Sequence, residues 1–150
     1  MNRRYLFLLS LLLTAAVLAL IFGFSAQPAP QSDGLSTRLA EWLSRLAPWL
    51  AAKTDVRGLN RLLRKLAHFT LYFLLGCGLT GMLRSQERVA AAPAAVALGM
   101  LFAALDEWHQ AFVPGRGPGW GDVLLDSCGV AAAVGCIALA SRLKNKKTGE

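Results

Sequence analysis

Residues 5–24 form a run of 20 positions, from Tyr5 to Phe24, that contains no charged side chain. As an α-helix this run is roughly 30 Å long, which matches the hydrocarbon thickness of a bilayer. A cleaved signal peptide is the alternative, but its apolar core is normally only about 7–15 residues long and a small-x-small site follows it. The segment Phe24-Ser25-Ala26-Gln27-Pro28 offers no good site of that kind. We therefore expect an uncleaved membrane anchor.

Three further apolar segments, at residues 66–83, 89–105 and 123–140, are also long enough to cross a bilayer. Apolar residues make up 55% of the chain and charged residues only 17%, a balance that argues against a soluble globular fold. Glycine and alanine are frequent in these segments, and small residues let membrane helices approach closely. The sequence predicts one all-α integral membrane domain over residues 1–150, with four transmembrane helices.

The segment between the first two spans is more polar. Residues 25–36 are rich in Pro, Gly and Ser and read as a loop, and residues 53–65 read as a basic connector. Between them, apolar side chains recur at helical spacing over residues 35–50, with charged residues off that stripe. Its tryptophans, Trp42 and Trp49, suit a membrane interface. We predict an interfacial amphipathic helix over 35–50 that Pro48 kinks or ends; a helix packed over the bundle remains the alternative.

The chain carries 16 Lys and Arg against 9 Asp and Glu, a net charge of +7. These basic residues flank apolar runs, so they indicate lipid headgroups and not nucleic acid. Four spans place both termini on one side, and Arg3, Arg4 and the C-terminal lysines then predict cytoplasmic termini by the positive-inside rule. The seven basic residues of the outward segment 25–65 argue against this orientation. The three cysteines lie inside apolar stretches without metal-ligand spacing and are interpreted as packing residues.

Polar side chains recur at helical spacing near one end of spans two, three and four. Lys65, His68 and Tyr72 share one face at the start of the second span, and Asp122 and Asp126 share one face at the start of the fourth. The third span ends on a similar group. Because these three ends lie on the same side of the membrane, we expect one outer-face polar pocket. Its candidate binding residues are Lys65, His68, Tyr72, Asp106, Glu107, His109, Gln110, Arg116, Asp122 and Asp126.

Intramembrane ionisable groups are costly unless paired, and they generally mark functional sites. Lys65 and Arg116 are the expected partners of the carboxylates, and Arg116 suits a phosphate or carboxylate ligand. The alternative is that these ion pairs only fix the positions of the helices relative to one another. His109 as a general base, and a metal site built from His68, His109 and the carboxylates, are further alternatives. No nucleophile stands out, so the sequence assigns no catalytic residue, cofactor or metal ion.

At these residues the chain resembles the VanZ-like family of small membrane proteins, named after an accessory protein of teicoplanin resistance. The shared pieces are Phe24-Ser25-Ala26-Gln27-Pro28, Lys65-x-x-His68-x-x-x-Tyr72, Asp106-Glu107-x-His109-Gln110-x-Phe112-x-Pro114-Gly115-Arg116 and Asp122-x-x-x-Asp126-x-x-Gly129. They span roughly residues 20 to 135 in the family's order. The chain departs from the family in two places. Asp126 stands where many relatives carry Asn, and the amphipathic segment 35–50 is longer than expected.

The resemblance implies a multi-pass protein of the bacterial cytoplasmic membrane, associated with glycopeptide resistance or cell-envelope physiology. The first hypothesis is therefore a pocket that binds an anionic or lipid-linked envelope component, with Lys65 and Arg116 contacting the anion and with membrane lipids as partners. In this hypothesis Asp122 and Asp126 hold Arg116. An enzyme acting on such a headgroup, with His109 or Glu107 as acid or base, is the second hypothesis. A structural or partner-binding bundle is the third.

Overall fold

The computed structural model describes residues 2–47, 55–86 and 90–148, and every regular element in these segments is an α-helix. The helices are α1 (Arg3–Ser25), α2 (Ala29–Leu46), α4 (Val56–Ser85), α5 (Ala91–Gln110) and α6 (Trp120–Thr148). Four of them, α1, α4, α5 and α6, are long and apolar enough to cross a membrane. The prediction of an all-α protein with four transmembrane helices is confirmed.

The outer surface of the bundle is apolar. On α1, the side chains of Tyr5, Leu9 and Leu12 are 68%, 61% and 67% exposed. A monomeric soluble protein rarely leaves such contiguous apolar surface in water. Lipid tails can cover these apolar side chains without a free-energy cost. The exposed apolar surface is therefore consistent with helices that span a membrane.

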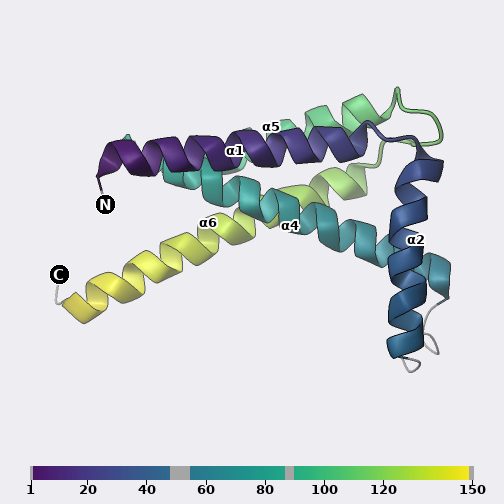
Figure 1. Cartoon of the computed structure of the whole chain (residues 1–150). Coiled ribbons are helices and arrows are strands. Elements are labelled where there is room, and N and C mark those ends of the chain that lie inside the picture. Colours follow the sequence, from purple (N-terminus) through teal and green to yellow (C-terminus); the bar gives the residue numbers. More distant parts are fainter. Residues whose placement is uncertain (1, 48–54, 87–89, 149–150) are drawn as a thin grey trace.

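Helix α4 is the central element, because it contacts all four other described helices. The start of α1 and the end of α6 lie apart from each other at the same end of the bundle, and α2 lies across the opposite end (Figure 1). At 30 residues, α4 is roughly 45 Å long and exceeds the thickness of the hydrocarbon core. Its basic first turns therefore extend past the apolar layer, toward α2.

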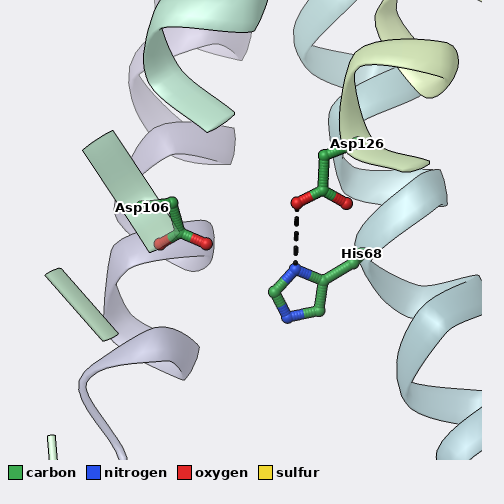
Figure 2. A group of neighbouring side chains, drawn as sticks. All are labelled: His68, Asp106 and Asp126. Carbon is green, nitrogen blue, oxygen red and sulfur yellow. Dashed lines mark ion pairs between the residues drawn. The ribbon is translucent and has the colours of Figure 1, made fainter. Parts of the chain in front are cut away.

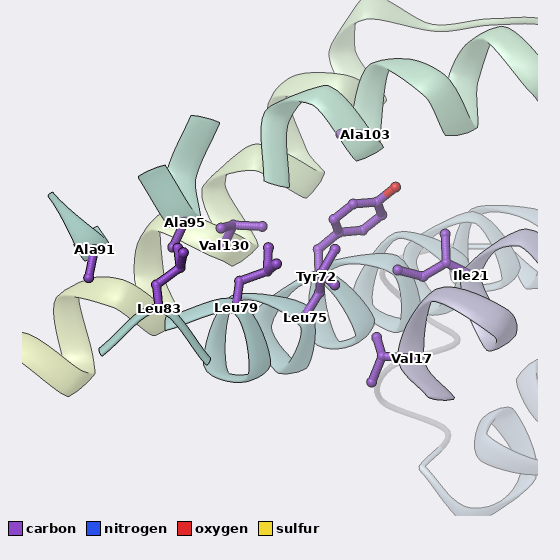
Figure 3. Packing of buried hydrophobic residues seen from close by; sticks show 10 residues of the cluster. All are labelled: Val17, Ile21, Tyr72, Leu75, Leu79, Leu83, Ala91, Ala95, Ala103 and Val130. Atoms are coloured by element: carbon purple, nitrogen blue, oxygen red, sulfur yellow. The ribbon is translucent and has the colours of Figure 1, made fainter. Parts of the chain in front are cut away.

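The core follows one face of α4, where Tyr72, Leu75 and Leu79 are at most 2% exposed (Figure 3). Val130 of α6 and small residues of α5 pack against this face. Glycines allow the close approach of α4 and α6. A Cβ atom added to Gly129 would lie 2.7 Å from the carbonyl oxygen of Phe69, and one added to Gly76 would lie 2.9 Å from that of Val130.

The segment between the first two spans is more helical than the sequence predicted. Helix α2 starts at Ala29, inside the stretch read as a loop, because Pro30 falls in its first turn, where proline is tolerated. Helix α4 starts at Val56, inside the stretch read as a connector, and the carboxylate of Asp55 caps it by accepting a hydrogen bond of 2.7 Å from Gly58 N. The prediction that Pro48 ends the amphipathic helix falls on residues outside those described, as does the start of the predicted third span at residue 89.

Helix α2 combines two properties that were predicted as alternatives. It packs on α4 through the fully buried Ala40 and through a hydrogen bond of 3.2 Å from Asn60 Nδ2 to Thr37 Oγ1. Leu39, Trp42 and Leu46 remain 46%, 57% and 62% exposed. The helix thus lies against the bundle and still presents apolar side chains outward.

Candidate functional site

Polar side chains from four helices meet at the end of the bundle that α2 crosses. This end comprises the last turn of α1, the first half of α4, the last turns of α5 and the first turns of α6 (Figure 1). The antiparallel arrangement of consecutive spans brings these helix ends together. The polar side chains of the second, third and fourth spans therefore lie at one end of the bundle, and α1 contributes as well.

Asp106 of α5 is fully buried and is held by two donors. The hydroxyl of Ser25 donates a hydrogen bond of 3.0 Å to Asp106 Oδ2, and Gln110 Nε2 donates another of 3.0 Å to the same oxygen. The other oxygen, Oδ1, is buried and accepts no hydrogen bond from any residue that the structure describes. One oxygen is thus fixed in place while the second is available.

The loop between α5 and α6 folds back over this network. Arg116 Nη1 donates a hydrogen bond of 3.3 Å to Gln110 Oε1, and Nη2 donates one of 3.0 Å to the carbonyl oxygen of Phe24. The backbone amide of Gly119 donates a hydrogen bond of 2.7 Å to Glu107 Oε2. Arg116 and Glu107 therefore join the loop to the ends of α1 and α5.

Lys65 and Asp122 form an ion pair across α4 and α6, with 3.0 Å between Nζ and Oδ1. Their side chains are 57% and 44% exposed. An ion pair this exposed contributes little to stability, about 0–1 kcal/mol. Its main effect is to place one cation and one anion at the mouth of the site.

About one helical turn further along α4 and α6, His68 and two carboxylates form a second cluster (Figure 2). His68 Nδ1 lies 3.5 Å from Asp126 Oδ2, and Asp126 is fully buried. One ligand atom from each of His68, Asp106 and Asp126 lies within 4.8 Å of the other two. The three side chains come from α4, α5 and α6, so the cluster joins all three helices.

Two cavities open beside these residues. The polar cavity has a volume of about 230 Å³ and is lined by Arg61, Arg64, Lys65, His68, Glu107, Gln110, Asp122, Leu125 and Asp126. The apolar groove has a volume of about 520 Å³ and lies between α1, α2 and α4, with Leu39, Leu63, Leu66 and Leu71 in its wall. Arg64 and His68 line both, so the two spaces adjoin at α4.

Six of the ten predicted site residues line the polar cavity; they are Lys65, His68, Glu107, Gln110, Asp122 and Asp126. Asp106 belongs to the cluster with His68 and Asp126. Arg116 lines the apolar groove. Tyr72 is fully buried and donates a hydrogen bond of 3.3 Å to the carbonyl oxygen of Phe102. His109 lines neither of the two described cavities, and its ring lies edge-on to Phe22 with 6.1 Å between centroids.

The partners of Asp122 and Asp126 differ from those in the first hypothesis. Asp122 pairs with Lys65 and Asp126 faces His68, whereas the first hypothesis had both carboxylates hold Arg116. The described hydrogen bonds of Arg116 go to Gln110 and Phe24. His68 is therefore an ion-pair partner that sequence reasoning did not assign.

Sequence reasoning also missed Ser25, Arg61 and Arg64. Arg61 and Arg64 precede Lys65 and His68 by one helical turn, so extending the stripe of the second span toward its start would have found them. Ser25 was part of the segment that resembles the family, but nothing in that segment indicated a bond to Asp106, 81 residues away.

Residues 8–141 of the chain match the model of the VanZ/LLP1 family. No curated protein and no solved structure matches the chain. The match covers most of the sequence and includes the larger part of each of the four membrane-spanning helices. The chain is a VanZ-like multi-pass membrane protein and belongs to the VanZ/LLP1 family.

Proposed function

We propose that this protein binds an anionic, lipid-linked component of the bacterial cell envelope, with the headgroup in the polar cavity and the hydrocarbon chain in the apolar groove. The observation that carries the proposal is the sharing of Arg64 and His68 between the two spaces. A molecule with a charged head and an apolar tail matches such a pair of adjoining sites. A free anion would leave the groove unused.

The cations of the polar cavity support an anionic headgroup. Arg61, Arg64 and Lys65 lie within about one turn of α4 and all line the cavity. Guanidinium groups bind phosphate and carboxylate through paired hydrogen bonds, and a lysine adds a point charge. Glu107, Asp122 and Asp126 line the same cavity, so hydroxyl or amino groups of a headgroup would also find acceptors.

The apolar groove supports a lipid ligand. Its wall includes Leu39 of α2 and Leu66 of α4, which are 46% and 53% exposed. Pockets for lipophilic ligands are lined mainly by apolar side chains with a few polar groups that fix orientation. Here Arg64, His68 and Arg116 are those groups.

In this proposal the site faces outward from the cytoplasmic membrane, and both termini lie in the cytoplasm. Arg3 and Arg4 at one terminus and Arg142 and Lys144 at the other support this orientation by the positive-inside rule. An outward site would meet envelope precursors on the side of the membrane where glycopeptides act. The association with teicoplanin resistance is proposed on this basis and on the family's name.

Lipid titration of the purified protein, followed by native mass spectrometry, tests the proposal. The probes are a polyprenyl phosphate, phosphatidylglycerol and phosphatidylcholine. We expect the two anionic lipids to bind at least tenfold more tightly than phosphatidylcholine. The double variant Arg61→Ala/Lys65→Ala should lose that preference. Arg38→Ala should keep it, because Arg38 is exposed on α2 and lines neither cavity.

Equal affinity for anionic and zwitterionic lipids would overturn the proposal. An unchanged preference in the double variant would overturn the assignment of the polar cavity. Comparison of the polyprenyl phosphate with phosphatidylglycerol then tells whether the ligand is a lipid-linked precursor or a bulk anionic phospholipid.

A further inference from the structure

We infer that His68, Asp106 and Asp126 bind one divalent transition-metal ion, of the Zn²⁺ or Mn²⁺ class, at the base of the polar cavity. The metal site is inferred from the distances and burial of these three side chains. Its role toward a headgroup rests on the proposed function.

The spacing of the three side chains fits a single ion. Two ligands bound at about 2.0–2.1 Å to one tetrahedral ion lie roughly 3.3 Å apart, and ligands on opposite sides of an ion lie roughly 4.2 Å apart. His68 Nδ1 and Asp126 Oδ2 are 3.5 Å apart, and one ligand atom from each of the three residues lies within 4.8 Å of the other two. Small side-chain rotations would close the remaining gaps.

The carboxylates lack enough partners without a cation. Asp106 and Asp126 are both fully buried, and three of their four oxygens accept no hydrogen bond from the described residues: Asp106 Oδ1 and both oxygens of Asp126, of which Oδ2 lies 3.5 Å from His68 Nδ1. Buried charges in proteins are paired or coordinate metals, because an unpaired buried carboxylate is very costly. His68 supplies at most one positive charge for two acids. A doubly charged ion bound to neutral His68 would balance them fully.

The surroundings orient the ligands as a metal site requires. Ser25 and Gln110 both donate to Asp106 Oδ2, so this carboxylate is fixed and its Oδ1 remains for an ion. Hydrogen bonds to the second oxygen of a ligating carboxylate are typical of metal sites. Because the ligands come from α4, α5 and α6, an ion would also tie the three helices together.

The ligand set indicates the class of ion. One imidazole nitrogen with two carboxylate oxygens suits Zn²⁺ or Mn²⁺ better than Mg²⁺, which prefers oxygen ligands and water, or Cu⁺, which prefers sulfur. Three protein ligands leave at least one coordination position open. His68 and Asp126 line the polar cavity, so the open position would face it and could take an oxygen of an anionic headgroup.

Metal titration of chelator-treated protein in detergent tests the inference without any lipid. Zn²⁺ binding is followed by calorimetry, and Mn²⁺ binding by electron paramagnetic resonance. We expect one ion per chain. His68→Ala and Asp126→Ala should abolish stoichiometric binding, and Gln110→Ala should weaken it about 10–100-fold through loss of carboxylate orientation. Glu41→Gln is the control, since Glu41 is an exposed carboxylate of α2 that lines neither cavity and lies outside the cluster, so this variant should keep the ion.

Wild-type protein that retains its helical circular dichroism and binds neither ion would overturn the inference, whatever the variants do. Binding that persists in both His68→Ala and Asp126→Ala would also overturn it. The lipid titration, repeated in the presence of a chelator, separates the two proposals. Anionic preference with no bound ion removes only the metal site, and a bound ion with no anionic preference removes only the proposed function.

Discussion

Glu107 Oε2 accepts a hydrogen bond of 2.7 Å from the backbone amide of Gly119, across the loop that joins α5 to α6. Glu107 Oε1 accepts a second bond, of 3.3 Å, from Gln110 Nε2. One carboxylate therefore connects the last turn of α5 with the residue that precedes α6. It therefore holds the end of the loop against the last turn of α5.

Substitution of Glu107 should destabilise this end of the bundle. Glu107→Ala removes a charge-assisted acceptor, and hydrogen bonds to charged groups contribute about 1.5–3 kcal/mol. We expect a loss of that size in the free energy of unfolding in detergent. Glu107→Gln should lose less, because its amide oxygen still accepts from Gly119. Glu41→Ala, an exposed position on α2, is the control, and equal stability of Glu107→Ala and Glu41→Ala would contradict the prediction.

The Lys65–Asp122 pair should influence ligand binding more than stability. Asp122→Asn removes the anion that competes for Lys65, so affinity for anionic lipids should rise severalfold, while Lys65→Ala should lower it. Both variants should unfold within about 1 kcal/mol of the wild type, as exposed pairs do. Lipid titration and thermal unfolding of the same preparations check the two statements. Weaker anion binding by Asp122→Asn would show that Asp122 itself contacts the ligand.

A methyl group on Gly129 should separate α4 from α6. The added Cβ would lie 2.7 Å from the carbonyl oxygen of Phe69, a backbone atom that cannot rotate away. Overpacking of this kind costs about 1–3 kcal/mol, and the melting temperature should fall accordingly. Gly135→Ala is a control on the same helix, since a Cβ there meets nothing within 4 Å. Its melting temperature should stay the same or rise slightly, because alanine favours helix.

Cysteine accessibility should reveal the orientation in the membrane. In a variant with Cys77, Cys128 and Cys136 replaced by serine, a cysteine at Glu41 should react with an impermeant maleimide in intact cells. A cysteine at Arg142 should react only after lysis. Both positions are exposed, so burial does not confound the comparison. The reverse pattern would place the polar cavity on the cytoplasmic side.

The spanning helices could be predicted because each depends on the composition of its own segment. Residues 5–24 predict α1 almost to its ends, since a run without charge of that length has few alternatives. The start of α2 could not be predicted in this way. Pro28, Pro30 and Gly34 resemble a loop by composition, although the first turn of a helix accepts proline.

The convergence of the polar stripes was also predictable, because alternating spans return to the same side. The individual partners were not. Whether Asp126 faces His68 or Arg116 depends on the rotation of α6 about its axis, which the glycine contacts with α4 set. His109 shows the same limit. Its spacing from Asp106 fits the stripe, but its ring contacts Phe22 of α1.

The groove between α1, α2 and α4 has a consequence for how a ligand would be supplied. Its wall contains leucines that are partly exposed on the flank of the bundle, so a lipid would arrive by diffusion within the leaflet and not from water. Occupancy would then depend on the mole fraction of that lipid in the membrane. A change in leaflet composition would alter occupancy even where the dissolved concentration of every envelope precursor stayed constant.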